Sequence, residues 1–316
     1  RYVRHSAPFH AVLARTAAFV VPASALWALL PLFARQQLGL DATGYGLVLG
    51  CLGAGAIAGA LGLPLIRDRV SSDRLVMLAT GVFAAVTAAV AMTQAPAAAG
   101  VALFLGGIAW MGAMSTLNVA AQNAVPAWVR ARGLAVGLLV LQGGMGFGSL
   151  GWGVIATRAG IPTALVGGAA ALLVGIVLSR RYALHGLSNL DLTPDPRWTL
   201  PETVCELDGD EGPVLVTLEY RIAPADGVAF LTAVHRLERI RRRDGAIRWN
   251  VYRDTEDVER WVEVFVVGSW LEHLRQHERV TAGDRRVLDD AARFHRGEGG
   301  PRVRHHIAGG PFVHRA

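Results

Sequence analysis

The stretch that decides the fold covers residues 75–121 and reads LVMLATGVFAAVTAAVAMTQAPAAAGVALFLGGIAWMGAMSTLNVAA. It holds two apolar runs, 75–92 and 98–121, separated by a short uncharged loop. The wider segment 74–190 contains no aspartate and no glutamate. Runs of about 18–24 apolar residues are long enough for a helix to cross a hydrocarbon core of about 30 Å. The stretch is therefore predicted to be a pair of membrane-spanning helices.

Four further apolar runs extend this pattern on both sides. The six predicted spans are residues 11–33, 44–66, 75–92, 98–121, 133–156 and 161–178. None of these runs contains an acid, so we expect no proton-coupling carboxylate within this part of the chain. Residues 1–185 are predicted to form an all-α membrane bundle of six transmembrane helices.

Charge divides the 316-residue chain unevenly. Residues 1–190 hold twelve arginines and three acids, whereas residues 191–316 hold nineteen arginines and twenty-two acids. The net charge of +6 thus belongs to the membrane half and gives no support for nucleic-acid binding. The arginines gather in alternate loops, and the positive-inside rule then places both ends of the bundle in the cytoplasm. We expect a multi-pass protein of a bacterial inner membrane.

Few polar side chains interrupt the predicted spans. Asn118 and Gln122 lie four residues apart and so share one helical face, while Trp110 and Gln142 lie in the fourth and fifth runs. Buried amides in a membrane need a partner or a water-filled cavity. Two interpretations stay open, an interhelical hydrogen bond or the lining of a central cavity. The substrate-cavity candidates are Trp110, Asn118, Gln122 and Gln142.

Glycines recur in the second and fifth runs. Helix faces that carry several glycines let helix backbones approach closely in lipid. The alternative for the cluster at 143–148 is a flexible or broken helix, as transporters often need.

Two arginine-containing loops carry a family resemblance. The first, residues 62–75, reads GLPLIRDRVSSDRL and resembles a degenerate Gly-x-x-x-Asp-Arg-x-Gly-Arg motif. The second, residues 126–137, reads PAWVRARGLAVG and resembles a Pro…Arg-x-Arg-Gly-x-Ala pattern. Both are similar to loops in the C-terminal six-helix half of major facilitator superfamily transporters. The closer resemblance is to the enterobactin-exporter-like, transmembrane secretion effector branch.

This resemblance implies an exporter of small hydrophobic molecules of the siderophore, antibiotic or drug type, with two six-helix halves rocking around a central cavity. It also implies cytoplasmic gating loops, although topology alone is the other interpretation of their charge. The gating candidates are Arg67, Asp68, Arg69, Arg74, Arg130 and Arg132. Six helices need a second half, and the start at Arg1 rather than Met favours a missing N-terminal half over a second chain.

Beyond residue 185 the periodicity changes. We expect a linker at 186–210, a second domain at 211–310 and a short tail at 311–316. The predicted strands are 213–222, 247–252, 261–267 and 302–307, and the predicted helices are 226–243, 270–278 and 284–294. The order βαββαβ, with an extra helix before the last strand, predicts an α+β ferredoxin-like domain.

Both faces of the predicted strand 261–267 are largely apolar. Helices of the same chain cover one face, so the other face needs a second cover, and we expect a homodimer. The stretch SWLEHLRQHERV at 269–280 resembles the antibiotic-biosynthesis-monooxygenase-like family of dimeric α/β barrels. The tail would then be a cytoplasmic dimerisation or regulatory module.

Members of that family use Asn, Trp, Tyr or His groups in a cavity between sheet and helices. The tail pocket candidates here are Trp249, Trp261 and His273, but the first strand has no Asn and no full catalytic set stands in order. The resemblance therefore implies the fold and not the chemistry, and we expect no cofactor. The alternative is a membrane-tethered cofactor-free monooxygenase acting on a polycyclic or phenolic product. A ligand-sensing tail is a third option.

His273 and His277 lie four residues apart and could hold a metal ion. No acid of fitting spacing accompanies them, so ordinary surface or hydrogen-bonding histidines are the expected interpretation. We expect no metal site.

Overall fold

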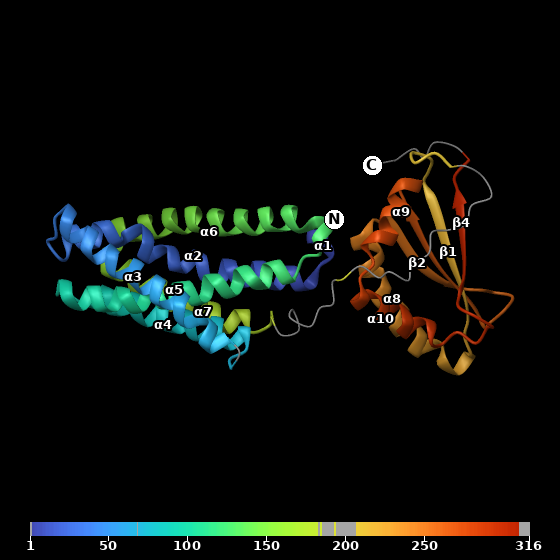
Figure 1. Cartoon of the computed structure of the whole chain (residues 1–316), viewed down its shortest axis with the longest axis horizontal. Helices are drawn as coiled ribbons and strands as arrows, with labels where there is room; N and C mark the ends of the chain where they lie inside the picture. The colour runs from blue at the N-terminus through green and yellow to red at the C-terminus, as the bar shows by residue number, and fades with distance from the viewer. Residues whose placement is uncertain (1, 68, 183, 185–192, 194–206, 310–316) are drawn as a thin grey trace. The chain divides into compact units, whose positions relative to one another are not determined.

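The computed structural model describes residues 2–67, 69–182, 184, 193 and 207–309 (Figure 1). The chain divides into two compact units. The membrane unit consists of Ala7–Val125 and Val129–Asn189, and the tail unit consists of Arg1–Ser6, Pro126–Trp128 and Leu190–Ala316. Each unit has its own hydrophobic core.

Six helices in the described part of the chain are long and apolar enough to cross a membrane. They are α2 (Ala7–Gln36), α3 (Ala42–Arg67), α4 (Ser72–Met92), α5 (Pro96–Asn123), α6 (Arg130–Ala159) and α7 (Ile161–Ser179). The short helix α1 (Tyr2–His5) precedes α2 in the chain, and the 3-10 turn η1 (Ala127–Val129) lies between α5 and α6 in the sequence. The prediction of a six-helix membrane bundle is confirmed.

The structure corrects one prediction about the spans and decides between two others. The expectation that no span contains an acid is wrong, because α4 begins at Ser72 and so includes Asp73. The helix begins three residues before the predicted run 75–92. In contrast, α6 is one continuous helix through residues 143–148, which favours close packing over a broken helix for that glycine cluster.

The six helices pack in a row that curves around α2. α3 packs on α5, α5 on α4, α4 on α7, α7 on α2, and α2 on α6. The two ends of the row are the least buried helices. Only 22% of the most apolar 18-residue window of α3 and 11% of that of α6 are buried, against 61% in α2. The unit thus has a packed centre and two largely exposed helices, α3 and α6, which we call the open helices.

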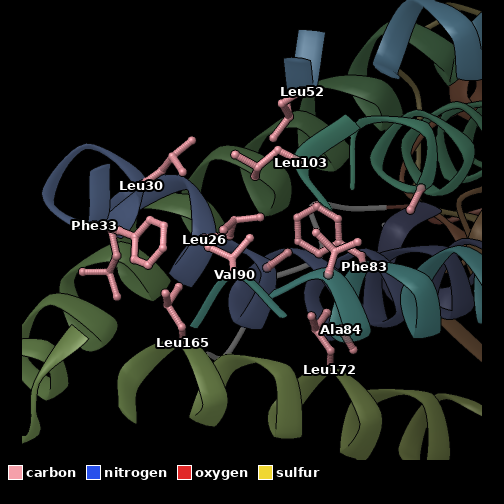
Figure 2. Packing of buried hydrophobic residues seen from close by; sticks show 14 of the residues in the cluster. Leu26, Leu30, Phe33, Leu52, Phe83, Ala84, Val90, Leu103, Leu165 and Leu172 are labelled. Carbon is pink, nitrogen blue, oxygen red and sulfur yellow. The ribbon is translucent and has the colours of Figure 1, made fainter. Parts of the chain in front are cut away.

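The packed centre is aliphatic and aromatic. Figure 2 shows side chains from five helices meeting there, among them Leu26 of α2, Phe83 of α4 and Leu165 of α7. Leu52 of α3 and Leu103 of α5 join the same cluster. In lipid this contact is driven by close packing rather than by removal of apolar surface from water.

Glycine sets the closest approach in the unit. A methyl group at Gly55 of α3 would overlap the backbone carbonyl of Phe104 in α5, and one at Gly107 would overlap the carbonyl of Leu52. The two helices therefore touch backbone to backbone, which only glycine permits.

The tail unit contains a four-stranded sheet with helices on one face (Figure 1). Its elements are β1 (Val214–Arg221), the 3-10 turn η2 (Pro224–Asp226), α8 (Gly227–Asp244), β2 (Arg248–Arg253), β3 (Arg260–Val267), α9 (Trp270–Arg279), α10 (Ala282–Ala292) and β4 (Arg302–Ile307). The strand order is β2-β3-β1-β4, and every neighbouring pair is antiparallel. Alternate residues of β1, beginning with Val214 and Val216, face the helices and are buried.

We predict that Gly55→Ala destabilises the membrane unit. The added methyl group must push α3 and α5 apart, and overpacking of this kind costs about 1–3 kcal/mol. The melting temperature of the purified chain in detergent should fall by roughly 2–4 °C for each kcal/mol. The matched control is Gly81→Ala in α4, because a methyl group there meets no described atom within 4 Å. Equal melting temperatures for both variants would contradict the close approach.

Candidate functional site

A buried ion pair lies inside the membrane unit. The Nη2 atom of Arg15, in the third turn of α2, lies 2.7 Å from Oδ1 of Asp73 in the first turn of α4. Both side chains are buried, at 3% and 7% exposed. A buried charge is tolerated in such a place only when it is paired and hydrogen-bonded. The pair therefore fixes the start of α4 against α2.

The segment after α7 completes this cluster. The backbone N–H of Leu184 donates to both carboxylate oxygens of Asp73, at 3.0 and 3.2 Å. The Nε–H of Arg15 donates to the backbone carbonyl of Tyr182. One salt bridge thus joins three segments far apart in sequence, at the end of the unit where α2 and α4 begin and α7 ends.

A small cavity adjoins the guanidinium of Arg15. Its volume is about 10 Å³, and Thr80 of α4 and Ser179 of α7 also line it. The Nη1 atom of Arg15 is buried without a hydrogen-bond partner among the described residues. The space is about the size of one water molecule beside a polar group that can bind it. The polar cluster therefore includes this small cavity as well as the ion pair.

The sequence-based predictions missed both members of this pair. Arg15 lies within the predicted span 11–33, and an arginine inside a span is by itself a sign of a functional site. Asp73 lies in the loop that resembles the superfamily motif, but the gating candidates of that loop are Arg67, Asp68, Arg69 and Arg74. Hydropathy marks the two spans, but it does not show that Arg15 and Asp73 pair between them.

An aromatic cluster lies among α2, α4 and α5. The ring of Trp110 lies 5.5 Å from that of Phe19, 5.1 Å from that of Trp27 and 5.7 Å from that of Phe83, measured between ring centroids. The indole N–H of Trp27 is buried and has no hydrogen-bond partner among the described residues. An unsatisfied buried donor is costly, so this indole N–H is a polar group that still lacks an acceptor among the described residues.

The other three cavity candidates lie on the outside of the unit. Asn118 and Gln122 are exposed on α5, and Gln142 is exposed near the middle of α6. The structure therefore does not bring Trp110 and the three amides into one enclosed space. Exposed amides at membrane depth must face water or protein rather than lipid.

The gating-loop candidates lie mostly at the surface. Arg69, Arg74, Arg130 and Arg132 are exposed, and Arg67, the last residue of α3, is partly buried. Asp68 lies outside the described residues. The buried charge of this region belongs instead to Arg15 and Asp73.

A separate apolar hollow lies between the first turns of α3 and α5. Its volume is about 360 Å³, within the range of small-molecule pockets. Val48, Cys51 and Phe104 are among its lining residues, and none of the four cavity candidates lines it. The hollow carries no polar contact that would orient a ligand, so it is a weaker candidate than the aromatic cluster.

In the tail unit, Trp249 belongs to a buried polar network. Glu263 of β3 is fully buried, and its Oε1 atom accepts hydrogen bonds from Nε of Arg241 at 2.9 Å and from the indole N–H of Trp249 at 3.0 Å. The hydroxyl of Tyr220 donates to Oε2 at 3.1 Å. Burial raises the pKa of Tyr220 well above its usual value, and the Glu263 carboxylate adds to this effect. Burial alone would lower the pKa of Arg241, but Glu263 outweighs it and raises that pKa.

The three tail pocket candidates therefore enter three different sets of contacts. Trp249 donates to Glu263. Trp261 packs its ring against Phe230, with centroids 5.8 Å apart. His273 lies with two other histidines. Glu263 was also missed, although an acid within an otherwise apolar alternating strand is a visible signal.

Comparison with known proteins supports the membrane assignment. The family model described as "Transmembrane secretion effector" matches residues 1–310 of this chain. A search of curated proteins found no match.

We predict that Asp73→Asn destabilises the membrane unit, because it leaves the Arg15 guanidinium buried without its counter-charge. Breaking a buried pair in this way costs about 3–5 kcal/mol, which corresponds to a melting temperature lower by roughly 6 °C or more in detergent. Arg74→Gln is the matched control, since Arg74 is the next residue in the chain and is exposed.

The double variant Arg15→Leu with Asp73→Leu should lose less stability than the sum of the two single variants, because neither charge is then left alone. Additive losses, or equal melting of Asp73→Asn and Arg74→Gln, would show that the two groups do not depend on each other.

Proposed function

The chain belongs to the transmembrane secretion effector family, within the major facilitator superfamily, and from this we propose that it exports small hydrophobic molecules across a bacterial inner membrane. Its six apolar helices form a multi-pass membrane transporter unit. The substrates would be of the siderophore, antibiotic or drug type. Both ends of the unit would then lie in the cytoplasm, on the side of the arginine-containing loops.

The observation that carries this proposal is the aromatic cluster around Trp110. Three rings from α2 and α4 surround the Trp110 ring at 5.1–5.7 Å. Flat apolar surfaces with one unsatisfied donor, the Trp27 indole N–H, suit an apolar molecule that carries a carbonyl or ether acceptor. Asn118, Gln122 and Gln142 would add polar lining on the substrate path.

Transport by rocking needs a second six-helix half beside this one. The open helices α3 and α6 are the faces we assign to it. Methyl groups at Gly50 and Gly53 of α3, and at Gly146 and Gly153 of α6, meet no described atom within 4 Å. Outward-facing glycines of this kind allow another helix to approach closely. The exposed amide of Gln142 on α6 would then face protein or a water-filled cavity and not lipid.

The Arg15–Asp73 pair has a place in this mechanism. Its described contacts join α2, α4 and the segment after α7 within the membrane unit. It would therefore keep this half rigid while the exposed loop arginines make and break contacts with the other half.

We predict that Trp27→Phe weakens export. The substitution keeps a ring in the cluster and removes only the indole N–H. A lost hydrogen bond of about 1 kcal/mol corresponds to roughly a fivefold higher half-saturating concentration. Efflux of apolar fluorescent dyes with and without a carbonyl acceptor should be compared in cells that produce the whole transporter.

Only the dyes with an acceptor should be affected by Trp27→Phe. Trp128→Phe is the matched control, because Trp128 lies in η1 outside the cluster. An equal effect on both dye classes would remove the indole N–H from the binding site. Unchanged efflux of every dye tried by Trp27→Phe and Trp110→Ala would remove the whole cluster.

The tail would be a cytoplasmic dimerisation or regulatory module with a ferredoxin-like fold. Its support is the strand order and the outer face of the sheet. Val262, Val264 and Val266 of β3 are only partly buried, and they lie beside Leu215 and Thr217 of β1. The helices of the chain cover the opposite face. A second copy of the same sheet is the cover that we propose for this apolar face.

We predict that Val264→Arg separates the tail dimer, because a buried unpaired charge in an apolar interface is strongly unfavourable. The mass of the purified chain in detergent, measured by light scattering, should fall to one half. Val228→Arg is the matched control, since Val228 at the start of α8 is 80% exposed. A monomeric wild type would contradict the dimer. A dimer that survives Val264→Arg would show that the interface lies on another face.

A further inference from the structure

Three histidines of the tail unit converge between helix and sheet. His273 and His277 lie one turn apart on α9, and His305 lies on the edge strand β4. One ring nitrogen from each lies within 4.8 Å of the other two. The ring centroid of His273 lies 4.4 Å from that of His277 and 4.6 Å from that of His305. The fold brings His305 to residues that lie 28 and 32 positions earlier in the sequence.

The register of the sheet explains this convergence. His305 pairs with Val216 of β1, whose side chain faces the helices and is buried. His306, the next residue, pairs with Leu215 and is exposed on the other face. A one-residue change of register would therefore turn His305 away from α9. His273 is only 2% exposed, so the cluster is anchored in the interior.

The Nε2 atoms of His273 and His277 are close enough for a hydrogen bond between them, and a metal ion that binds both nitrogens would replace that bond. The Nε2 atoms of His273 and His277 lie 2.9 Å apart, each with a lone pair when its ring is neutral and unprotonated there. The Nε2 atom of His305 is buried and has no hydrogen-bond partner among the described residues. Tetrahedral coordination with bonds of about 2.0–2.1 Å places ligand nitrogens about 3.3 Å apart. Small rotations of these rings would reach that spacing.

The charge of Arg241, which acts electrostatically on both His273 and His277, is compensated by its salt bridge to Glu263 at 2.9 Å.

We propose that His273, His277 and His305 form a binding site for a divalent first-row transition metal ion, with Zn²⁺ as the best fit. Three imidazoles with one position left open suit Zn²⁺, Co²⁺, Ni²⁺ and Cu²⁺ better than Mg²⁺ or Ca²⁺, which prefer oxygen ligands. The bound ion would tie the edge strand β4 to α9. The interpretation of His273 and His277 as ordinary histidines changes because their third ligand comes from a distant strand.

The test is metal binding by the full chain, purified without a histidine tag, stripped with a chelator and kept in detergent. Equilibrium dialysis with Zn²⁺ should show one tight site per chain. Co²⁺ should give the intense visible absorption of a four-coordinate ion. His305→Ala and His273→Ala should each weaken binding by more than the 10–100-fold that the loss of an outer-shell partner costs.

His306→Ala is the matched control, because it removes the neighbouring imidazole on the same strand from the opposite face. It should keep wild-type affinity and the Co²⁺ spectrum. Circular dichroism and thermal melting identify any variant that fails to fold, and His277→Gln then serves as a further substitution on α9. Equal Zn²⁺ binding by wild type and His305→Ala, or an octahedral Co²⁺ spectrum in wild type, would overturn the proposal.

Discussion

A charge that is removed from water must find its counter-charge, and each unit contains a buried ion pair of this kind. In the membrane unit the pair is Arg15 with Asp73, and in the tail unit it is Arg241 with Glu263. In each case the carboxylate also accepts hydrogen bonds from further donors. These are a backbone N–H for Asp73 and the side chains of Tyr220 and Trp249 for Glu263. Such pairs add little net stability compared with apolar contacts, but each permits only one arrangement of the elements that carry it.

Helix packing in the membrane unit follows from the absence of a hydrophobic driving force between helices in lipid. Contact must come from close approach, and glycine provides it where α3 meets α5. The same residue type on the outer faces of α3 and α6 meets nothing within the unit. A glycine lowers helix stability, and at those positions no contact with a described neighbour offsets the loss. In the proposed transporter, close packing with a helix of the second half would offset it.

The sequence predicted most elements because their periodicity is local, and it missed what depends on distant contacts. Apolar length defined the six spans, and alternation placed β3 almost to the residue. Asp73 was assigned to a loop because hydropathy ends at Leu75, whereas the backbone hydrogen bonds of α4 begin earlier. His305 could not be joined to His273 without the register of β4 on β1, and this register depends on the turn and the core rather than on either strand. The exposed position of Asn118 also follows only from how α5 packs.

An interface that opens and closes during transport must be strong enough to form and weak enough to break. The outer faces of α3 and α6 offer glycine and apolar surface, whose contacts are individually weak and tolerate sliding. The buried ion pair of Arg15 with Asp73 instead ties α2 to α4 within the membrane unit. In the proposed rocking mechanism this division would let the six helices move as one body, because the motion would not have to break the buried ion pair.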